Sequence, residues 1–481
     1  YFNDDDFYSG TATQSLRMDY GSDPNLNITN SGAPTLNTKG TLSFWYKRGI
    51  QGSGTGQHQY MIHTGTGTAD NTHMDLKIET GDVLSIGAYG TTPFAGTRLL
   101  RDASAWYHIV VAFDSTSGTA SDRLIKVYVN SVVQTGTFGA VAQNQQFPWI
   151  NASQAIYIGR HASVNRPMDG YLAEWNLVDG QALTPASFGE TKNGTWIPIK
   201  YTGAYGDNGA RLQFNQVGVG TASTSTIGAD TSGNDNHWTS SGIVASDCNM
   251  PDSPENNFCT WNPLSASASQ GSVKTLTEGN LQFSGGAFGV VGGTMAVTSG
   301  KWYWEIKLLS TVNGSNPFVI GFVSTTSIAH ASAHDQSVVM YSDNGSGKLI
   351  QHIENSSVTQ NITIPDALLS FDVNDVMQFA YDGDTGKIWV GKNNTYVAND
   401  GGTDGNPSNG SNQTFTLADT SILMTPLADH GGVAWTGLAN FGQLTNAYTA
   451  PTNFNPLSTA NLPEPTIGPN STTQADDHFK T

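Results

Sequence analysis

Asp75, Lys77 and Glu79 alternate with apolar residues in the segment 74–79. This alternation predicts a β-strand that places all three side chains on one face. Two carboxylates on one face could act as acid and nucleophile in retaining glycoside hydrolysis, which needs them about 5 Å apart. Here a lysine stands between them, so we interpret the face as charge-compensated and exposed to solvent. The chain has only eight glutamates, and the two nearest are 16 positions apart. We therefore predict no catalytic residues and no enzymatic activity.

Two further patterns could bind metal ions. His330 and His334, followed by Asp335, have a spacing that on a helix could seat a metal. Neither a helix nor a third ligand is predicted there, so we favour a loop with incidental histidines and predict no metal site. The acidic segments 4–6 and 382–386 offer oxygen ligands suited to calcium, although the second also has the Asp and Gly residues of a hairpin turn. Calcium stays an open alternative, and no other cofactor is predicted.

Three aromatic residues in predicted loops are candidate ligand-binding residues: Trp149, Phe94 and Tyr396. Loop aromatics can stack on sugar rings while neighbouring amides form hydrogen bonds to the hydroxyl groups. Most tryptophans of a β-sandwich instead fill its core, so the structural alternative remains open for each of the three. Trp149 is the strongest candidate, because it follows Pro148 and lies outside any strand alternation.

The chain has two cysteines, Cys248 and Cys259, in one loop that also contains two prolines. A disulfide closing this loop would contribute on the order of 3 kcal/mol to stability in the chain-entropy model. The alternative is a pair of free thiols, and the sequence favours neither.

The composition indicates an all-β protein. Charged residues make up 12% of the chain and glycine 54 of its 481 residues, whereas about 25% charged residues is usual. The chain is poor in strong helix formers, while Thr and the aromatics favour strands. The net charge is −18 and no Lys/Arg cluster occurs, so we predict no nucleic-acid partner. No run of 18 apolar residues occurs, so we predict no membrane insertion.

Short alternating segments separated by Gly, Asn, Asp and Ser predict two series of strands, of which 106–114 and 301–306 are the clearest members. Asn130 and Ser131 predict a tight hairpin turn, and Thr184 with Pro185 predicts a single helical turn. The first series is further predicted to contain strands at 42–47, 59–63, 74–79, 83–87, 124–129, 155–159 and 170–177.

The order of the motifs in the first series resembles the laminin-G-like, concanavalin A-like jelly roll over about residues 11–190. The most specific stretch is 170–190 (GYLAEWNLVDGQALTPASFGE), in which a closing strand leads to an "ALTP"-type helical turn. The other matching stretches are 41–49 (TLSFWYKRG), 105–114 (AWYHIVVAFD), 124–134 (LIKVYVNSVVQ) and 156–161 (IYIGRH). Since this fold also includes glucanases, the resemblance keeps a polysaccharide-degrading enzyme as an alternative.

The second series resembles SPRY domains, with five motifs in the expected order. That resemblance implies a second β-sandwich that binds proteins through its loops. The matching stretches are 300–308 (GKWYWEIKL), 318–324 (FVIGFVS), 339–349 (VMYSDNGSGKL), 375–393 (DVMQFAYDGDTGKIWVGKN) and 437–443 (GLANFGQ).

We therefore expect two antiparallel jelly-roll-type β-sandwiches joined by an ordered Gly/Asn/Ser-rich linker, whose extended segments could add strands to either neighbour. The expected boundaries are 1–200 for the laminin-G-like domain, 201–263 for the linker, 264–451 for the SPRY-like domain and 452–481 for a C-terminal arm.

Together with the joint at 194–209 (GTWIPIKYTGAYGDNG), this arrangement resembles structural proteins of marine tailed bacteriophages. The resemblance implies a non-enzymatic decoration, fibre or spike protein on the extracellular surface of a virion. Its implied partners are other virion proteins and host-surface glycans or proteins, for attachment or particle stabilisation. A homo-oligomer and a purely structural capsid or tail component without a ligand remain alternatives, and no heptad pattern supports a coiled-coil stalk.

Overall fold

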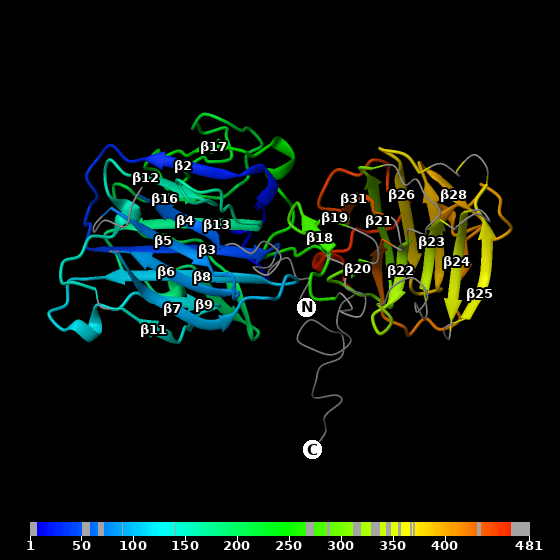
Figure 1. The fold of residues 1–481 in the computed structure, drawn as a ribbon, viewed down its shortest axis with the longest axis horizontal. Helices are drawn as coiled ribbons and strands as arrows, with labels where there is room; N and C mark the ends of the chain where they lie inside the picture. Colours follow the sequence, from blue (N-terminus) through cyan, green and yellow to red (C-terminus); the bar gives the residue numbers. More distant parts are fainter. Residues whose placement is uncertain are drawn as a thin grey trace, which may run out of the picture. The chain divides into compact units, whose positions relative to one another are not determined.

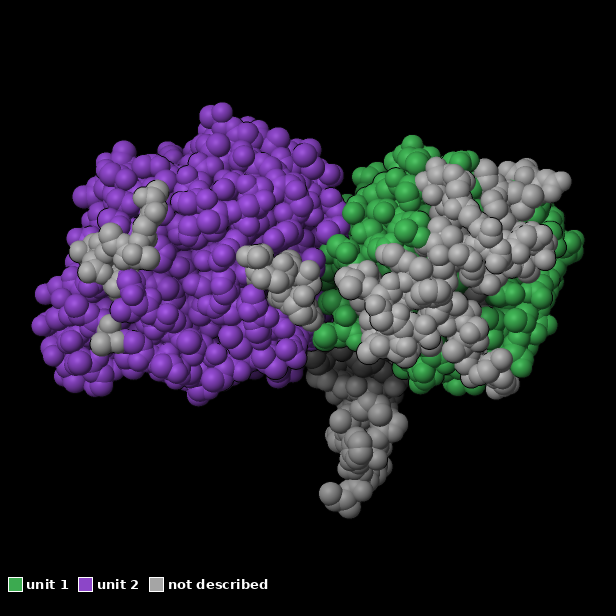
Figure 2. All heavy atoms as spheres, in the orientation of Figure 1, with its two compact units in different colours: residues 1–4, 258–276, 280–481 green, residues 5–257, 277–279 purple. Residues whose placement is uncertain are grey.

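The computed structural model of the chain is built from antiparallel β-strands and short 3-10 turns (Figure 1). It describes residues 7–50, 58–65, 72–88, 90–139, 141–265, 274–285, 289–310, 319–328, 337–342, 348–354, 357–365, 368, 371–430 and 434–462. The chain divides into two compact units, coloured purple and green in Figure 2. The N-terminal unit (purple) comprises residues 5–257 and 277–279, and the C-terminal unit (green) comprises residues 1–4, 258–276 and 280–481.

The N-terminal unit is a sandwich of two antiparallel sheets. Its core contains large side chains from both sheets, including Phe44 and Trp175 from one and Met61, Leu76 and Phe94 from the other. The seven-stranded sheet has the order β1 (Leu16–Met18), β13 (Gly170–Asp179), β3 (Lys39–Arg48), β8 (Trp106–Asp114), β9 (Lys126–Val129) and β10 (Val132–Val133), with β16 (Ala210–Leu212) also paired to β13. The eight-stranded sheet has the order β11 (Gly136–Phe138), β7 (Thr91–Leu99), β6 (Val83–Ala88), β5 (Met74–Ile78), β4 (Gln59–Thr64), β12 (Ala155–Ile158), β2 (Asn25–Thr29) and β17 (Thr239–Ser241).

The C-terminal unit is a second sandwich, with a core that includes Trp261, Trp304, Phe322 and Phe379. One sheet has the order β18 (Lys274–Thr277), β19 (Gln282–Gly285), β31 (Thr436–Asn440), β21 (Lys301–Leu308), β26 (Val376–Asp382), β27 (Lys387–Lys392) and β28 (Thr395–Val397), with β29 (Phe415–Thr416) also paired to β27. The other has the order β20 (Val290–Gly292), β30 (Met424–Asp429), β22 (Val319–Ser324), β23 (Ser337–Ser342), β24 (Lys348–Glu354) and β25 (Ser357–Thr363).

The strands and turns predicted from alternation are confirmed at their main positions. The segment 106–114 is β8, and 301–306 lies within β21. Asn130 and Ser131 have φ of 49° and 65°, as a type I′ hairpin turn between β9 and β10 requires. The helical turn predicted after Thr184 is a single 3-10 turn at Pro185–Ser187.

The segment expected to be a linker is instead divided between the two units. Residues up to 257 belong to the N-terminal unit, where β16 pairs with β13 and β17 pairs with β2. Tyr201 and Tyr205 pack with Val110 and Val178 in a small cluster separate from the main core. From residue 258 onward the chain belongs to the C-terminal unit, and Trp261 is part of its core. The aromatic anchors of this segment are isolated among turn residues and have no strand periodicity, so the sequence could not place the division between the units at residue 257.

The start of the expected C-terminal arm is also part of a folded unit. Leu457 lies in the core of the C-terminal unit, and Phe454 packs with Tyr303, Trp389 and Tyr396 in a second cluster. The backbone N–H of Tyr303 donates to the carbonyl of Asn455 at 2.9 Å. Residues 452–457 thus pack against this unit, and residues 463–481 lie outside the described residues.

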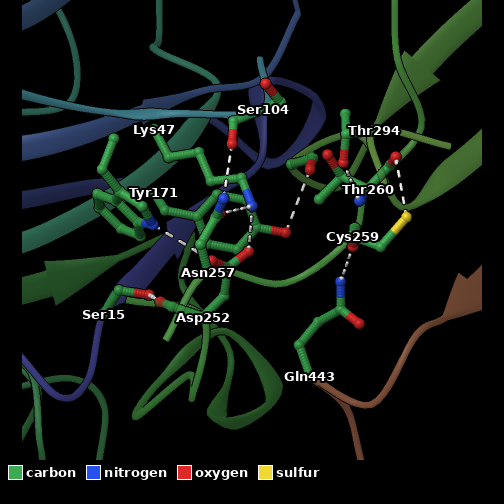
Figure 3. Close-up of polar contacts among 12 residues, drawn as sticks. Ser15, Lys47, Ser104, Tyr171, Asp252, Asn257, Cys259, Thr260, Thr294 and Gln443 are labelled. Carbon is green, nitrogen blue, oxygen red and sulfur yellow. Dashed lines mark hydrogen bonds and ion pairs between the residues drawn. The ribbon is translucent and has the colours of Figure 1, made fainter. Parts of the chain in front are cut away.

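A buried ion pair joins β3 to the segment that precedes residue 258 (Figure 3). Lys47 Nζ lies 2.7 Å from Asp252 Oδ2, and both side chains are 0% exposed. Asn257 Oδ1 accepts a second hydrogen bond from the ammonium at 2.7 Å, and Trp106 Nε1 donates to Asp252 Oδ1 at 3.3 Å. The Lys47 ammonium also lies 5.7 Å from the centre of the Tyr171 ring. A desolvated ammonium needs such partners, because burying an unpaired charge is costly.

We expect Lys47→Met to destabilise the N-terminal unit by about 3–5 kcal/mol, because it leaves the Asp252 carboxylate buried without its cation. Lys39→Met is the matched control: Lys39 pairs with Asp114 at 2.9 Å, but both side chains are about one-third exposed, so its loss should cost less than about 1 kcal/mol. Hydrogen-exchange mass spectrometry in urea would follow each unit separately. Equal losses for the two variants would contradict the assigned role of the buried pair.

Candidate functional site

The candidate site is a polar surface on the eight-stranded sheet of the N-terminal unit. In β5, Met74, Leu76 and Ile78 point into the core, so Asp75 and Lys77 lie on the opposite face. The register places His63 of β4 beside Asp75, and Tyr60 beside Lys77. We call this surface the histidine patch, and it consists of Tyr60, His63, His73, Asp75, Lys77, Glu79 and His161.

The acidic side chains of the patch are held by cations and hydrogen bonds. Lys77 Nζ lies 2.9 Å from Asp75 Oδ1 and 3.8 Å from Glu79 Oε1. His73 Nε2 lies 3.2 Å from Asp75 Oδ2, and the backbone N–H of Gly87 donates to Asp75 Oδ1 at 3.2 Å. The charge compensation predicted from the lysine is therefore present.

The predicted exposure of this face is wrong at its centre, since Asp75 is only 3% exposed. The side chain of Lys77 is 15% exposed and that of Glu79 28%. Neighbouring side chains account for the burial, because Lys77 and His73 both lie against the Asp75 carboxylate. The Lys77 ammonium also lies 5.5 Å from the centre of the Tyr60 ring.

These contacts fix the charges of the central pair. Burial alone would raise the pKa of Asp75, but the hydrogen bond from His73 and the charge of Lys77 outweigh it and lower that pKa. Burial alone would lower the pKa of Lys77, but Asp75 outweighs it and raises that pKa. Both groups are thus charged at neutral pH, and Asp75 is unsuited to donate a proton as a general acid.

Three imidazoles meet beside this pair. The ring centres of His63 and His161 are 3.8 Å apart, and those of His63 and His73 are 5.3 Å apart. His63 is 0% exposed, and its Nδ1 accepts a hydrogen bond from the backbone N–H of Ala162 at 3.3 Å. Burial, with a contribution from His161, lowers the pKa of His63 to about 3. His63 is therefore neutral at pH 7, with its proton on Nε2.

The histidines of the patch were not predicted from the sequence, because they come from separate strands and loops. His73 lies two positions before Asp75, so strand alternation places both side chains on the same face. For that reason His73 could have been predicted as part of the site. His63 and His161 become neighbours of Asp75 only through the pairing of β4 with β5 and of β12 with β4.

The neutral state of His63 predicts sensitivity to acid. Its pKa is lower in the folded state than in the unfolded state, where it is about 6.5. Below pH 6.5 the unfolded chain therefore binds the proton first, and stability falls as the pH decreases towards about 3. Between pH 7 and pH 5 we expect His63 to account for a loss of about 2 kcal/mol. Urea unfolding of the wild type and of His63→Gln at both pH values measures this loss as the difference between them.

In the folded wild-type protein at pH 5, the ¹⁵N chemical shifts of the imidazole ring, measured by NMR, should show that His63 is still neutral. A protonated His63 in the folded protein, or the same acid-induced loss of stability in both proteins, would contradict the assignment.

The three predicted ligand-binding aromatics are core side chains rather than exposed loop residues. Trp149 lies in a 3-10 turn, Pro148–Ile150, and is 0% exposed. Its Nε1 donates to the carbonyl of Met74 at 3.0 Å. Phe94 belongs to β7 and is 0% exposed, and Tyr396 belongs to β28 and is 7% exposed. This corrects the prediction: proline marked a local turn at Trp149, but the turn directs the ring inwards.

The metal-binding alternatives remain untested. The segments 4–6 and 330–335 lie outside the described residues. At the β26–β27 turn, the carboxylates accept hydrogen bonds from the backbone: Asp384 from Gly300 at 3.0 Å and Asp382 from Thr385 at 3.3 Å. Within the described residues, no group of three or more His, Cys, Asp or Glu side chains is arranged to hold a metal ion.

The two cysteines are free thiols, which corrects the disulfide alternative. Cys248 packs in the core of the N-terminal unit, and Cys259 packs in the core of the C-terminal unit. In the latter, Gln443 Nε2 donates to the carbonyl of Cys259 at 2.8 Å (Figure 3). Burial, with a smaller contribution from Asp247, raises the pKa of the Cys248 thiol to about 12. The loop sequence could not reveal that its two ends enter different cores.

Because both thiols are buried, we expect almost no reaction of the native protein with a thiol reagent such as Ellman's reagent at pH 8. In denaturant without a reductant, both cysteines should react. If denatured protein reacted only after reduction, the cysteines would be bridged and the structural assignment would be wrong.

A comparison with protein families agrees with the fold of the N-terminal unit. Residues 20–189 match a family described as the concanavalin A-like lectin/glucanases superfamily, so the N-terminal unit contains a concanavalin A-like domain. Among solved structures, the chain is similar to the SPRY domain of human HERC1, with 15% identity over 37% of this chain and 96% of that one, and a TM-score of 0.27.

It is also similar to a heptameric SAP-like pentraxin from Limulus polyphemus, with 15% identity over 36% of this chain and 76% of that one, and a TM-score of 0.26. A search among curated proteins gave no match. No helix in the described part of the chain has the length and apolar character needed to cross a bilayer.

Proposed function

We propose that this chain is a non-enzymatic ligand-binding protein of a virion surface, and that the histidine patch contacts host-surface glycans or proteins. The observation that carries the binding role is the position of Lys77 between Asp75 and Glu79. Because Lys77 holds both carboxylates in place, the patch offers a fixed array of hydrogen-bond donors and acceptors instead of an acid paired with a nucleophile. The concanavalin A-like domain supports such a role, because this superfamily includes lectins.

The virion location is supported by the sequence pattern of the joint at 194–209 and by the two consecutive sandwiches. The joint packs as part of the N-terminal unit: Trp196 Nε1 donates to His108 Nδ1 at 2.9 Å, and Tyr205 Oη donates to Asn176 Oδ1 at 2.6 Å. The joint therefore stabilises its own unit. Other virion proteins, and further copies of this chain, are the proposed partners on the particle.

A glycan array tests the binding role with wild type, Lys77→Gln and Lys126→Gln. We expect Lys77→Gln to weaken binding at least tenfold, because it removes the cation that fixes both carboxylates. Lys126 is an exposed lysine on the other sheet of the same unit, so its variant should bind like the wild type. Equal affinities for all three proteins would contradict a role for the patch.

Two further measurements separate the remaining alternatives. Reducing-sugar release from polysaccharides, abolished by Asp75→Asn, would identify an enzyme instead. Immunogold labelling of purified particles should place the chain on the virion surface, and detection only inside host cells would overturn the proposed location. Stoichiometric incorporation into particles without binding to any glycan or host-cell extract would favour a purely structural component.

A further inference from the structure

A second polar feature of the N-terminal unit is a cavity of about 300 Å³ lined by four carboxamide side chains. These belong to Asn37, Gln146, Asn151 and Gln154, and aliphatic groups including Ala33 and Ala152 complete the lining. None of the lining residues in the described part of the chain is charged. The lining residues come from the loop that leads into β3, from Thr72 just before β5, and from the segment before β12, so the cavity lies at one end of the sandwich.

Two amides of this cavity, those of Asn37 and Gln154, have unused hydrogen-bonding capacity, whereas Asn151 Nδ2 donates to Gln146 Oε1 at 2.9 Å. No hydrogen bond joins the side chains of Asn37 or Gln154 to another described residue. Nearby, the carbonyl of Asn30 accepts from the backbone N–H of Ser153 at 2.8 Å. The Asn30 side chain is 96% buried, yet within the described residues neither its Oδ1 nor its Nδ2 has a partner. Asn37 and Gln154 are half-buried, and Asn30 lies outside the lining of the cavity. A buried unsatisfied amide such as that of Asn30 is rare and often marks a place that water or a ligand completes.

We propose that this amide cavity binds one uncharged sugar unit of a glycan. A carboxamide both donates and accepts hydrogen bonds, as a sugar hydroxyl does, and Ala33 and Ala152 offer apolar contact for the C–H groups of a sugar ring. A charged ligand would lose its hydration without gaining a counter-ion in the lining. The volume is at the lower end of the range for small-molecule sites, which suits one sugar unit rather than a long chain.

The cavity and the histidine patch are neighbours along the chain. Thr72, which lines the cavity, directly precedes His73 of the patch, and Gln154 directly precedes β12, which pairs with β4. A glycan that contacts the patch could therefore place its next unit in the cavity. The inference rests on the proposed glycan-binding function and adds to it the class of the ligand, a neutral saccharide, and a second set of contacts.

Methyl-TROSY NMR of the full chain with labelled alanine methyl groups tests the proposal. The probes are size-matched neutral and acidic oligosaccharides. We expect neutral probes to shift the Ala33 and Ala152 methyl signals, and to leave unchanged those of Ala112 and Ala182, which line a different cavity. The double variant Asn37→Ala/Gln154→Ala should weaken binding at least tenfold, because it removes two hydrogen-bonding amides. Gln143→Ala removes an exposed amide outside the cavity and should not change binding.

The outcomes distinguish the cavity from the patch. Binding that is lost in Lys77→Gln but unchanged in the double variant would overturn the cavity and leave the proposed function standing. Binding of acidic probes with the same shifts of Ala33 and Ala152 would overturn the assignment to neutral sugars. If no saccharide bound at all, both proposals would fail. Unchanged alanine signals outside the cavity would show that the double variant is folded.

Discussion

Burial of both faces of the seven-stranded sheet is the constraint on which the N-terminal unit depends. An antiparallel sheet commonly packs one face on a core and leaves the other in water. Here Lys47, His108 and Val110, which point away from the main core, are all 0% exposed. The sheet therefore needs a third layer of chain. The segments from β14 (Gly189–Lys192) and β15 (Thr195–Pro198) onward provide it, which explains why they fold with this unit rather than as a linker.

That burial requires each polar side chain on this face to have partners. His108 accepts a hydrogen bond from Trp196 on one nitrogen and contacts the Ser43 hydroxyl with the other at 2.9 Å, while burial lowers its pKa to about 3. Glu174 sits in a β-bulge of β13 with φ of 45°, an uncommon backbone conformation for this residue. Its carboxylate meets Arg211 of β16 through two hydrogen bonds, at 2.7 and 3.1 Å. The Trp196–His108 contact thus attaches the third layer by a specific polar interaction, while the Glu174–Arg211 contact ties β16 to β13 within the sheet.

Alternation predicted most of the strands, because their large side chains repeat with period two, as in β8. Alternation could not show that both faces of β8 are buried, because the local sequence does not distinguish a face covered by other segments from a face exposed to solvent. The site was only partly predictable for a related reason. Asp75, Lys77 and Glu79 are close in the sequence, whereas His63 and His161 join them through strand pairing. Trp149 was predicted to be a loop residue because it follows a proline. It lies in a single 3-10 turn instead, and its side chain is buried in the core.

The distribution of carboxyl groups bears on the choice between binding and catalysis. A general acid of a glycosidase needs a raised pKa and access to the substrate. Burial raises the pKa of Glu174, but its side chain is 2% exposed and bound to Arg211. Asp75 lies on the patch, but His73 and Lys77 lower its pKa. Glu174 thus has a raised pKa but an inaccessible carboxyl group, whereas the pKa of Asp75 on the patch is lowered. Neither of these two carboxyl groups therefore combines the pKa and the access that a general acid needs.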